Sequence, residues 1–196
     1  MAIRSLKSGS FSRSTQVGNS IILPGDYESI ATTTVGAGGS SSITFSSIPS
    51  TFTHLQIRAI SRTNRADTND FMTVRFNSDS SSVYAYHSLY GTGATAAAND
   101  TGTSTGTPWS GVTAGGNASA SMFGAVVWDI LDYQNTNKYK TVRLLSGTDQ
   151  NSTTGRLYFQ SNLWQSTSAI TTVTIIPTYG TSFAQYSHFA LYGIRG

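Results

Sequence analysis

Three histidines are the residues of this chain best suited to bind a metal ion or to act as a general base: His54, His87 and His188. They lie far apart in the sequence, each in a stretch expected to be a strand, and no metal-ligand spacing connects them. The many serines would allow a Ser-His-Asp triad, but a chain of strands lacks the strand–turn–helix context of a nucleophilic serine. We therefore expect ordinary sheet histidines, with no catalytic residue, no bound metal and no cofactor.

Four aspartates provide the carboxylates that glycan cleavage would need: Asp67, Asp70, Asp129 and Asp132. Paired carboxylates are the usual catalytic groups of glycoside hydrolases. These four, however, fall at expected strand ends and turns, where solvated carboxylates are common for reasons of backbone conformation alone. Calcium binding by Asp67 and Asp70, or by Asp132 with Asn135 and Asn137, is a weaker alternative, because no EF-hand spacing is present. We expect a protein without enzymatic activity.

The positive charge of the chain is concentrated at its N-terminus. The net charge is +3, and Arg4, Lys7 and Arg13 precede the first acidic residue, Asp26. Beyond that point nine Lys and Arg residues balance all nine Asp and Glu residues. Nucleic-acid binding would need a broad unopposed basic surface, so we expect no nucleic-acid partner.

The composition is typical of a β-rich protein whose surface polarity comes from hydroxyl groups. Charged residues make up 11% of the chain, while it contains 30 Ser and 28 Thr. The 9 Phe, 10 Tyr and 3 Trp residues supply enough apolar area to argue against disorder. The absence of cysteine excludes disulfides and thiolate sites, which makes oligomerisation the expected source of additional stability. No stretch approaches the roughly 20 apolar residues of a membrane span, so no membrane association is expected.

Residues 1–25 have no sustained apolar period and are predicted to form an extended N-terminal docking arm. Scattered apolar residues alternate there with Ser, Gly and basic residues. Such a segment cannot form an autonomous element, but it can become ordered on a partner surface. The predicted docking residues are Ile3, Arg4, Leu6, Lys7, Phe11 and Arg13.

Residues 26–196 are predicted to form one β-sandwich domain. In 54–61, Leu55, Ile57 and Ala59 alternate with polar residues, as in a half-buried strand. We expect 54–61, a strand ending near 76 and a strand beginning near 83 to form one sheet with tight connections. Nearly ten short strands without a convincing helix indicate an all-β, jelly-roll-like antiparallel sandwich.

The segment 91–117 is predicted to be a long Gly-rich loop. A loop of this length in a compact domain usually has a function or is disordered. Trp109 would be its anchor, and is retained as a glycan or subunit contact. Trp128 and Trp164 fall in expected strands and are assigned to the core or to a subunit interface.

Three stretches carry a resemblance to a known class of proteins: IPSTFTHLQIRAISR, VRFNSDSSSVYAYH and the C-terminal SHFALYGIRG. Together they resemble the small β-rich decoration, cement or fibre-type subunits of tailed-bacteriophage virions, over about residues 27–196. The resemblance implies a jelly-roll-like sandwich without enzymatic activity that belongs to a symmetric assembly.

The expected function is that of a capsid decoration or cement protein. It would assemble in the host bacterial cytoplasm as a homo-trimer and dock through its arm on the major capsid protein or another virion protein, on the particle exterior. The alternative is a tail-fibre or baseplate domain that binds a host surface polysaccharide through Trp109.

Overall fold

The protein is a sandwich of two antiparallel sheets, seen in a computed structural model that describes residues 15–17, 20–22, 25–150 and 155–196. The larger sheet has eight strands, in the spatial order β3 (Tyr27–Thr34), β14 (His188–Ile194), β5 (His54–Ser61), β10 (Gly124–Ile130), β11 (Lys140–Thr148), β12 (Arg156–Trp164), β7 (Tyr84–Gly91) and β8 (Ala96–Asp100). The smaller sheet has the order β4 (Ile43–Phe45), β13 (Val173–Pro177), β6 (Asn69–Phe76) and β9 (Trp109–Ala114). The predicted all-β antiparallel sandwich is confirmed.

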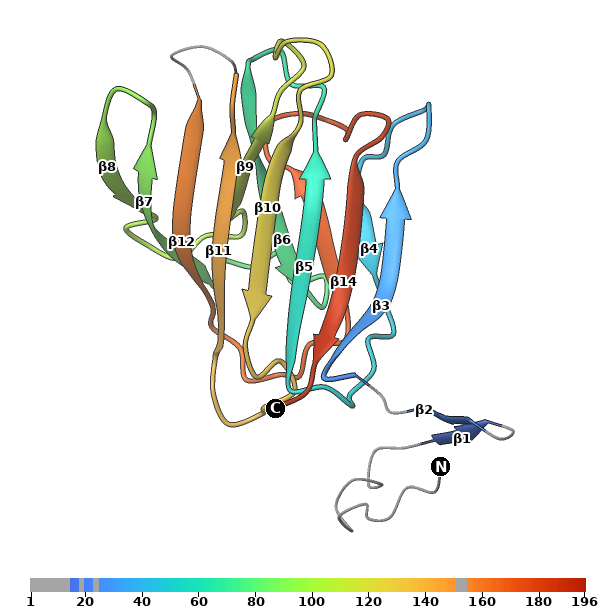
Figure 1. The fold of residues 1–196 in the computed structure, drawn as a ribbon. Helices are drawn as coiled ribbons and strands as arrows, with labels where there is room; N and C mark the ends of the chain where they lie inside the picture. The colour runs from blue at the N-terminus through green and yellow to red at the C-terminus, as the bar shows by residue number, and fades with distance from the viewer. Residues whose placement is uncertain (1–14, 18–19, 23–24, 151–154) are drawn as a thin grey trace.

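Figure 1 shows the large sheet in front of the small one, with β3 and β8 at its two ends. A separate two-stranded sheet pairs β1 (Thr15–Val17) with β2 (Ser20–Ile22). Within the described ranges the chain has no helix long and apolar enough to cross a membrane.

The core lies between the two sheets and is built from alternating strand residues. On β5 the side chains of Leu55, Ile57 and Ala59 are buried, as the sequence predicts. They meet apolar residues of the opposite sheet, including Val74 on β6 and Ile175 on β13. Burial of alternate residues from both sheets is what holds a sandwich together.

Two expectations from the sequence are wrong. The strands β5, β6 and β7 do not form one sheet, because β6 belongs to the small sheet and three strands separate β5 from β7 in the large one. The reason is that each sheet is completed by strands from distant parts of the chain: β14 pairs with β3 and β5, and β13 pairs with β4 and β6.

The segment 91–117 is also not a loop, since it contains β8 and β9. Its glycines allow the backbone of β9 to approach the large sheet closely. Gly111 has a φ of 103°, and a Cβ at this position would lie 3.1 Å from Val126. A left-handed conformation beneath a packed sheet is readily adopted only by glycine.

The strand β9 ends the small sheet, yet its open edge is buried under the large one. Side chains of the large sheet satisfy its backbone groups. Gln160 on β12 accepts a hydrogen bond from the Gly111 amide at 3.0 Å, and Ser146 on β11 accepts one from the Val112 amide at 3.0 Å. The Trp128 indole donates to the Ser110 carbonyl at 2.8 Å. Buried backbone groups need such partners, so the inner face of β11 and β12 must carry polar side chains.

Candidate docking face

The outer face of the large sheet is apolar over β11, β12, β7 and β8. Four large side chains there are more than half exposed: Leu89 at 63%, Leu145 at 53%, Leu157 at 57% and Phe159 at 53%. They belong to strands whose alternate residues point inward and are buried. A monomeric soluble protein rarely exposes a contiguous apolar patch of more than a few hundred Å².

Strand register arranges these side chains in two rows across the sheet. Phe159 lies opposite Leu89 on one side and Leu145 on the other. The first row contains Ala98, Leu89, Phe159, Leu145 and Val127, and the second contains Ala96, Gly91, Leu157, Gly147 and Ala125. Residues directly opposite on neighbouring strands have Cβ atoms about 5 Å apart. We call the two rows together the outer apolar face.

A polar row borders the outer apolar face. Asp100, His87, Ser161, Arg143 and Asp129 follow one another across β8, β7, β12, β11 and β10. The row continues to Gln56 on β5, whose amide nitrogen donates to Asp129 at 2.7 Å. This border carries charges of both signs.

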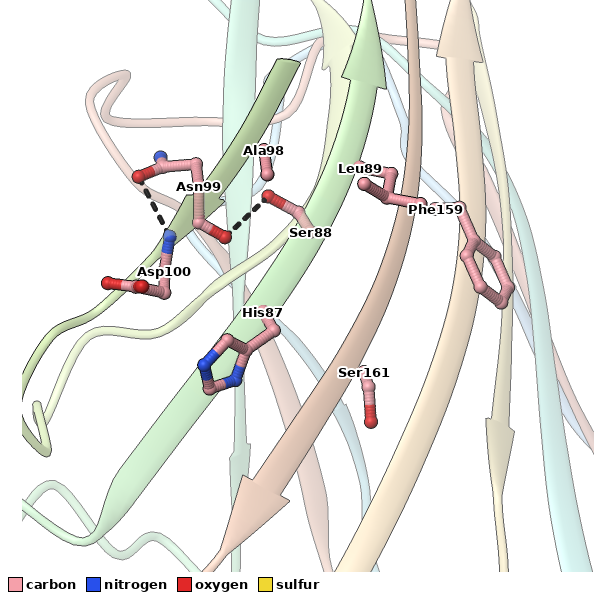
Figure 2. Close-up of a pocket in the computed structure, with 8 residues that line it drawn as sticks. All are labelled: His87, Ser88, Leu89, Ala98, Asn99, Asp100, Phe159 and Ser161. Atoms are coloured by element: carbon pink, nitrogen blue, oxygen red, sulfur yellow. Dashed lines mark hydrogen bonds between the residues drawn. The ribbon is translucent and has the colours of Figure 1, made fainter.

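The surface is hollowed where the apolar and polar rows meet, as Figure 2 shows. The hollow encloses about 430 Å³. Its lining residues are His87, Ser88, Leu89, Ala98, Asn99, Asp100, Phe159 and Ser161. A second hollow of about 550 Å³ lies beside it and is lined by Leu157 and the three alanines of β8, among others. An apolar floor with a polar rim suits a contact with protein side chains.

The opposite face of the same strands is ordinary protein interior. Tyr86 on β7 and Tyr158 on β12 point inward, and burial raises the pKa of both phenols. Burial raises the pKa of Tyr84 to about 12. The phenols therefore remain neutral around pH 7.

Trp109, the candidate glycan or subunit contact, lies at the start of β9 in a cluster of aromatic rings. Its ring stacks on Phe71 with centroids 4.5 Å apart and on Tyr86 with centroids 6.0 Å apart. The more exposed ring of the cluster is Tyr179, which is 51% exposed and lies under the Arg65 guanidinium at 4.4 Å. A ligand that approaches this cluster from solvent would therefore meet Tyr179 more readily than Trp109.

The candidate carboxylates have separate roles in the structure. Asp70 is fully buried and accepts hydrogen bonds from the Thr63 hydroxyl at 2.9 Å and the Gly180 amide at 2.9 Å. Asp67 pairs with Arg65, with Nη2 and Oδ2 3.1 Å apart. Asp132 pairs with Lys138, whose hydrogen bond to the carboxylate lowers the pKa of Asp132.

The histidines are placed on three different strands, β5, β7 and β14. His54 Nδ1 accepts a hydrogen bond from the Asp132 amide at 2.9 Å. His188 Nδ1 lies 2.8 Å from the Thr34 hydroxyl. Among the described residues, no three His, Asp or Glu side chains are grouped closely enough to hold a metal ion.

Two features escaped the sequence analysis. The segment Gly102–Gly106 reads GTSTG and so matches the spacing of a nucleophile elbow, G-x-S-x-G. It lies between β8 and β9 rather than before a helix, and Ser104 donates to Gln165 at 3.1 Å instead of to a histidine. The second feature is the outer apolar face itself. The sequence RLYFQSNLW indicates it, because Leu157 and Phe159 occupy alternate positions and so lie on the same face of a strand.

Ile3, Arg4, Leu6, Lys7, Phe11 and Arg13 all lie outside the described residues. Comparison of the chain with protein-family models, curated proteins and solved structures gave no match.

Proposed function

We propose that this protein is a non-enzymatic structural subunit of a tailed-phage virion, most specifically a capsid decoration protein. The observation that carries the proposal is the outer apolar face, with Leu89, Leu145, Leu157 and Phe159 each more than half exposed. Exposed apolar area of this kind is stabilised by contact with another protein. The resemblance of the sequence to virion subunits supplies the identity of the assembly.

The mechanism is the free energy of assembly. The arm, through Ile3, Leu6 and Phe11 and its basic residues, would lie on capsid subunits and bridge their junctions. Each contact need only be weak, because a bound subunit that touches several neighbours gains from effective concentration. Capsid symmetry then repeats the same contact over the particle.

The test is binding of the purified full-length chain to undecorated capsids. One variant replaces Ile3, Leu6 and Phe11 by Ser, and a second replaces Leu89 and Phe159 by Ser. We expect saturable binding of the wild-type chain at hundreds of copies per capsid, lost in the arm variant and weakened in the sheet variant. Tyr139→Ser, which alters an equally exposed aromatic residue outside the outer apolar face, is the matched control. Capsids that stay bare with the wild-type chain would refute the capsid assignment.

A tail-fibre or baseplate domain that binds a host polysaccharide is the second candidate. The exposed Tyr179 ring with Arg65 above it favours this alternative, since aromatic rings and polar groups together form sugar-binding platforms. Binding of the chain to host cells or to their purified polysaccharide, with capsids left bare, would establish it.

A further inference from the structure

The eight-stranded sheet has an unprotected edge at β8. Among the described residues, no strand pairs with β8 on the side away from β7. Its sequence, AAAND, contains none of the lysines or prolines that usually block the edge of a sheet, and its register with β7 is regular, without a bulge. Small alanine side chains leave the backbone of this edge open to another strand.

The register of β8 on β7 determines which backbone groups face the open edge. The Thr92 amide donates to the Thr95 carbonyl at 3.0 Å, and the Thr101 amide donates to the Tyr86 carbonyl at 3.2 Å. In an antiparallel pair, hydrogen-bonded and non-hydrogen-bonded residue pairs alternate. Residues 97 and 99 therefore direct their amide and carbonyl groups toward β7, while Ala96, Ala98 and Asp100 direct theirs away from it.

One of these outward groups already has a partner. The Asp100 amide donates to the Asn99 side-chain oxygen at 2.9 Å, in agreement with its direction away from β7 (Figure 2). For Ala96 and Ala98, no hydrogen bond on the outward side is present within the described residues. Outward groups repeated every second residue are the pattern that an added strand can satisfy.

We propose that β8 pairs antiparallel with β8 of a second copy of this chain, about a two-fold axis at Ala98. In this register Ala98 faces Ala98 of the partner subunit, and Ala96 faces Asp100 of the partner subunit. All three are residues whose backbone groups point outward, and on pairing the Asp100 amide would exchange its Asn99 acceptor for the carbonyl of the partner subunit's Ala96. A two-fold contact closes on itself and leaves no open β8 edge.

Charge and apolar continuity favour a second copy over a different partner. The axis brings two alanines together and places each Asp100 opposite an alanine, so no like charges face one another. The first row of the outer apolar face then continues from Leu145, Phe159, Leu89 and Ala98 of one protomer into the same residues of its partner. The pair thus presents a continuous apolar band twice as long as that of one chain.

This inference goes beyond the proposed function, because it holds whichever assembly the protein serves. It also differs from the three-fold association expected from the sequence, since a two-fold contact closes at two chains. Pairing over five residues buries less than the roughly 1,600 Å² of a standard interface, so we expect a dissociation constant in the micromolar range.

The experiment uses single cysteines in the otherwise cysteine-free full-length chain, without capsids. In Ala98→Cys the two Cα atoms would lie about 5.5 Å apart across the axis, within the disulfide range of about 4.4–6.8 Å. Ala96→Cys is the matched control, because Ala96 is also exposed and lies on the same face. Its two Cα atoms would be offset by four residues, or about 13 Å along the strand. We expect at least about tenfold more disulfide-linked dimer from Ala98→Cys than from Ala96→Cys under mild oxidation.

Sedimentation of the full-length chain is the second measurement. Ala98→Pro removes an outward amide that is not used in pairing with β7, so the fold should persist while self-association weakens by at least about tenfold. A wild-type chain that sediments as a monomer or a trimer, or equal crosslinking of the two cysteine variants, would overturn the two-fold pairing. Because capsids are absent, this outcome is independent of whether the chain binds capsids.

Discussion

Leu144 and Leu145 are consecutive residues of β11, yet Leu144 is 2% exposed and Leu145 is 53% exposed. Leu144 points into the core between the sheets, and Leu145 points out into the first row of the outer apolar face. Among the described residues, the apolar side chains of this strand are therefore covered on its inner side only.

The two leucines give a matched test of this arrangement. Leu144→Ser should lower the free energy of unfolding by about 3–5 kcal/mol, because it leaves a cavity and buries a hydroxyl. Leu145→Ser should change it by no more than about 0.5 kcal/mol. Urea denaturation measures both. Equal losses of stability would mean that the outer face is buried within the monomer.

Substitutions of Trp109 and Tyr179 distinguish a packing role from a ligand-binding role in the aromatic cluster. Trp109→Ala should lower the free energy of unfolding by about 2–4 kcal/mol, since its ring is stacked between Phe71 and Tyr86. Tyr179→Ala should cost about 1 kcal/mol or less, because the ring is half exposed and contacts Arg65 from solvent. Thermal unfolding measures the two stability changes, and a polysaccharide-binding assay of both variants shows which ring contacts the ligand. Loss of glycan binding in a fully stable Trp109→Ala variant would contradict the packing role.

Lys140 is fully buried and its ammonium group donates to three carbonyl oxygens, those of Asn135 at 2.6 Å, Lys138 at 3.1 Å and Thr167 at 3.1 Å. Lys140→Met should destabilise the protein by about 2–4 kcal/mol at neutral pH, because these buried acceptors lose their donor. Lys138→Met, which alters an exposed ion pair with Asp132, should cost no more than about 1 kcal/mol. Denaturant titration of the two variants tests the difference.

The same lysine should produce a dependence of stability on alkaline pH. Burial, and secondarily the Lys138 ammonium, lowers the pKa of Lys140 below its ordinary 10.5. Between the folded and unfolded pKa values the unfolded chain binds more protons, so the free energy of unfolding rises with pH in that interval. The difference between wild type and Lys140→Met should therefore grow as the pH approaches about 10.5. A constant difference across this range would argue against a lowered pKa.

Asp79 should contribute stability that is lost in acid. Hydrogen bonds from the Ser81 hydroxyl and then from the Trp164 indole, the latter 2.9 Å long, lower the pKa of Asp79 below 3.8. The Asp79 carboxylate contributes fully to the free energy of unfolding at pH values above its pKa in the unfolded chain. This contribution disappears as the pH falls through the lower pKa of Asp79 in the folded protein. The stability difference between wild type and Asp79→Asn should accordingly shrink between about pH 5 and pH 2. NMR titration of the carboxyl group should show a higher pKa in Trp164→Phe; an unchanged pKa would dismiss the indole hydrogen bond as a cause.

The sequence by itself determined the all-β fold class and the bounds of β5. The bounds 54–61 are those predicted, because the alternation of apolar and polar residues along a strand is a local signal. Strands within 91–117 were missed because their alanines, glycines and threonines give little alternation.

Only the tertiary structure decided which strands pair and which face of β12 is buried. The pairing of β14 with β3 and β5, and of β13 with β4, joins residues more than a hundred positions apart, and no local pattern encodes it. On β12 the polar side, with Gln160 and Asn162, faces inward, because the buried edge of β9 requires hydrogen-bond partners there. Leu157 and Phe159 are turned outward as a result, so the more apolar side of that strand is exposed in the outer apolar face.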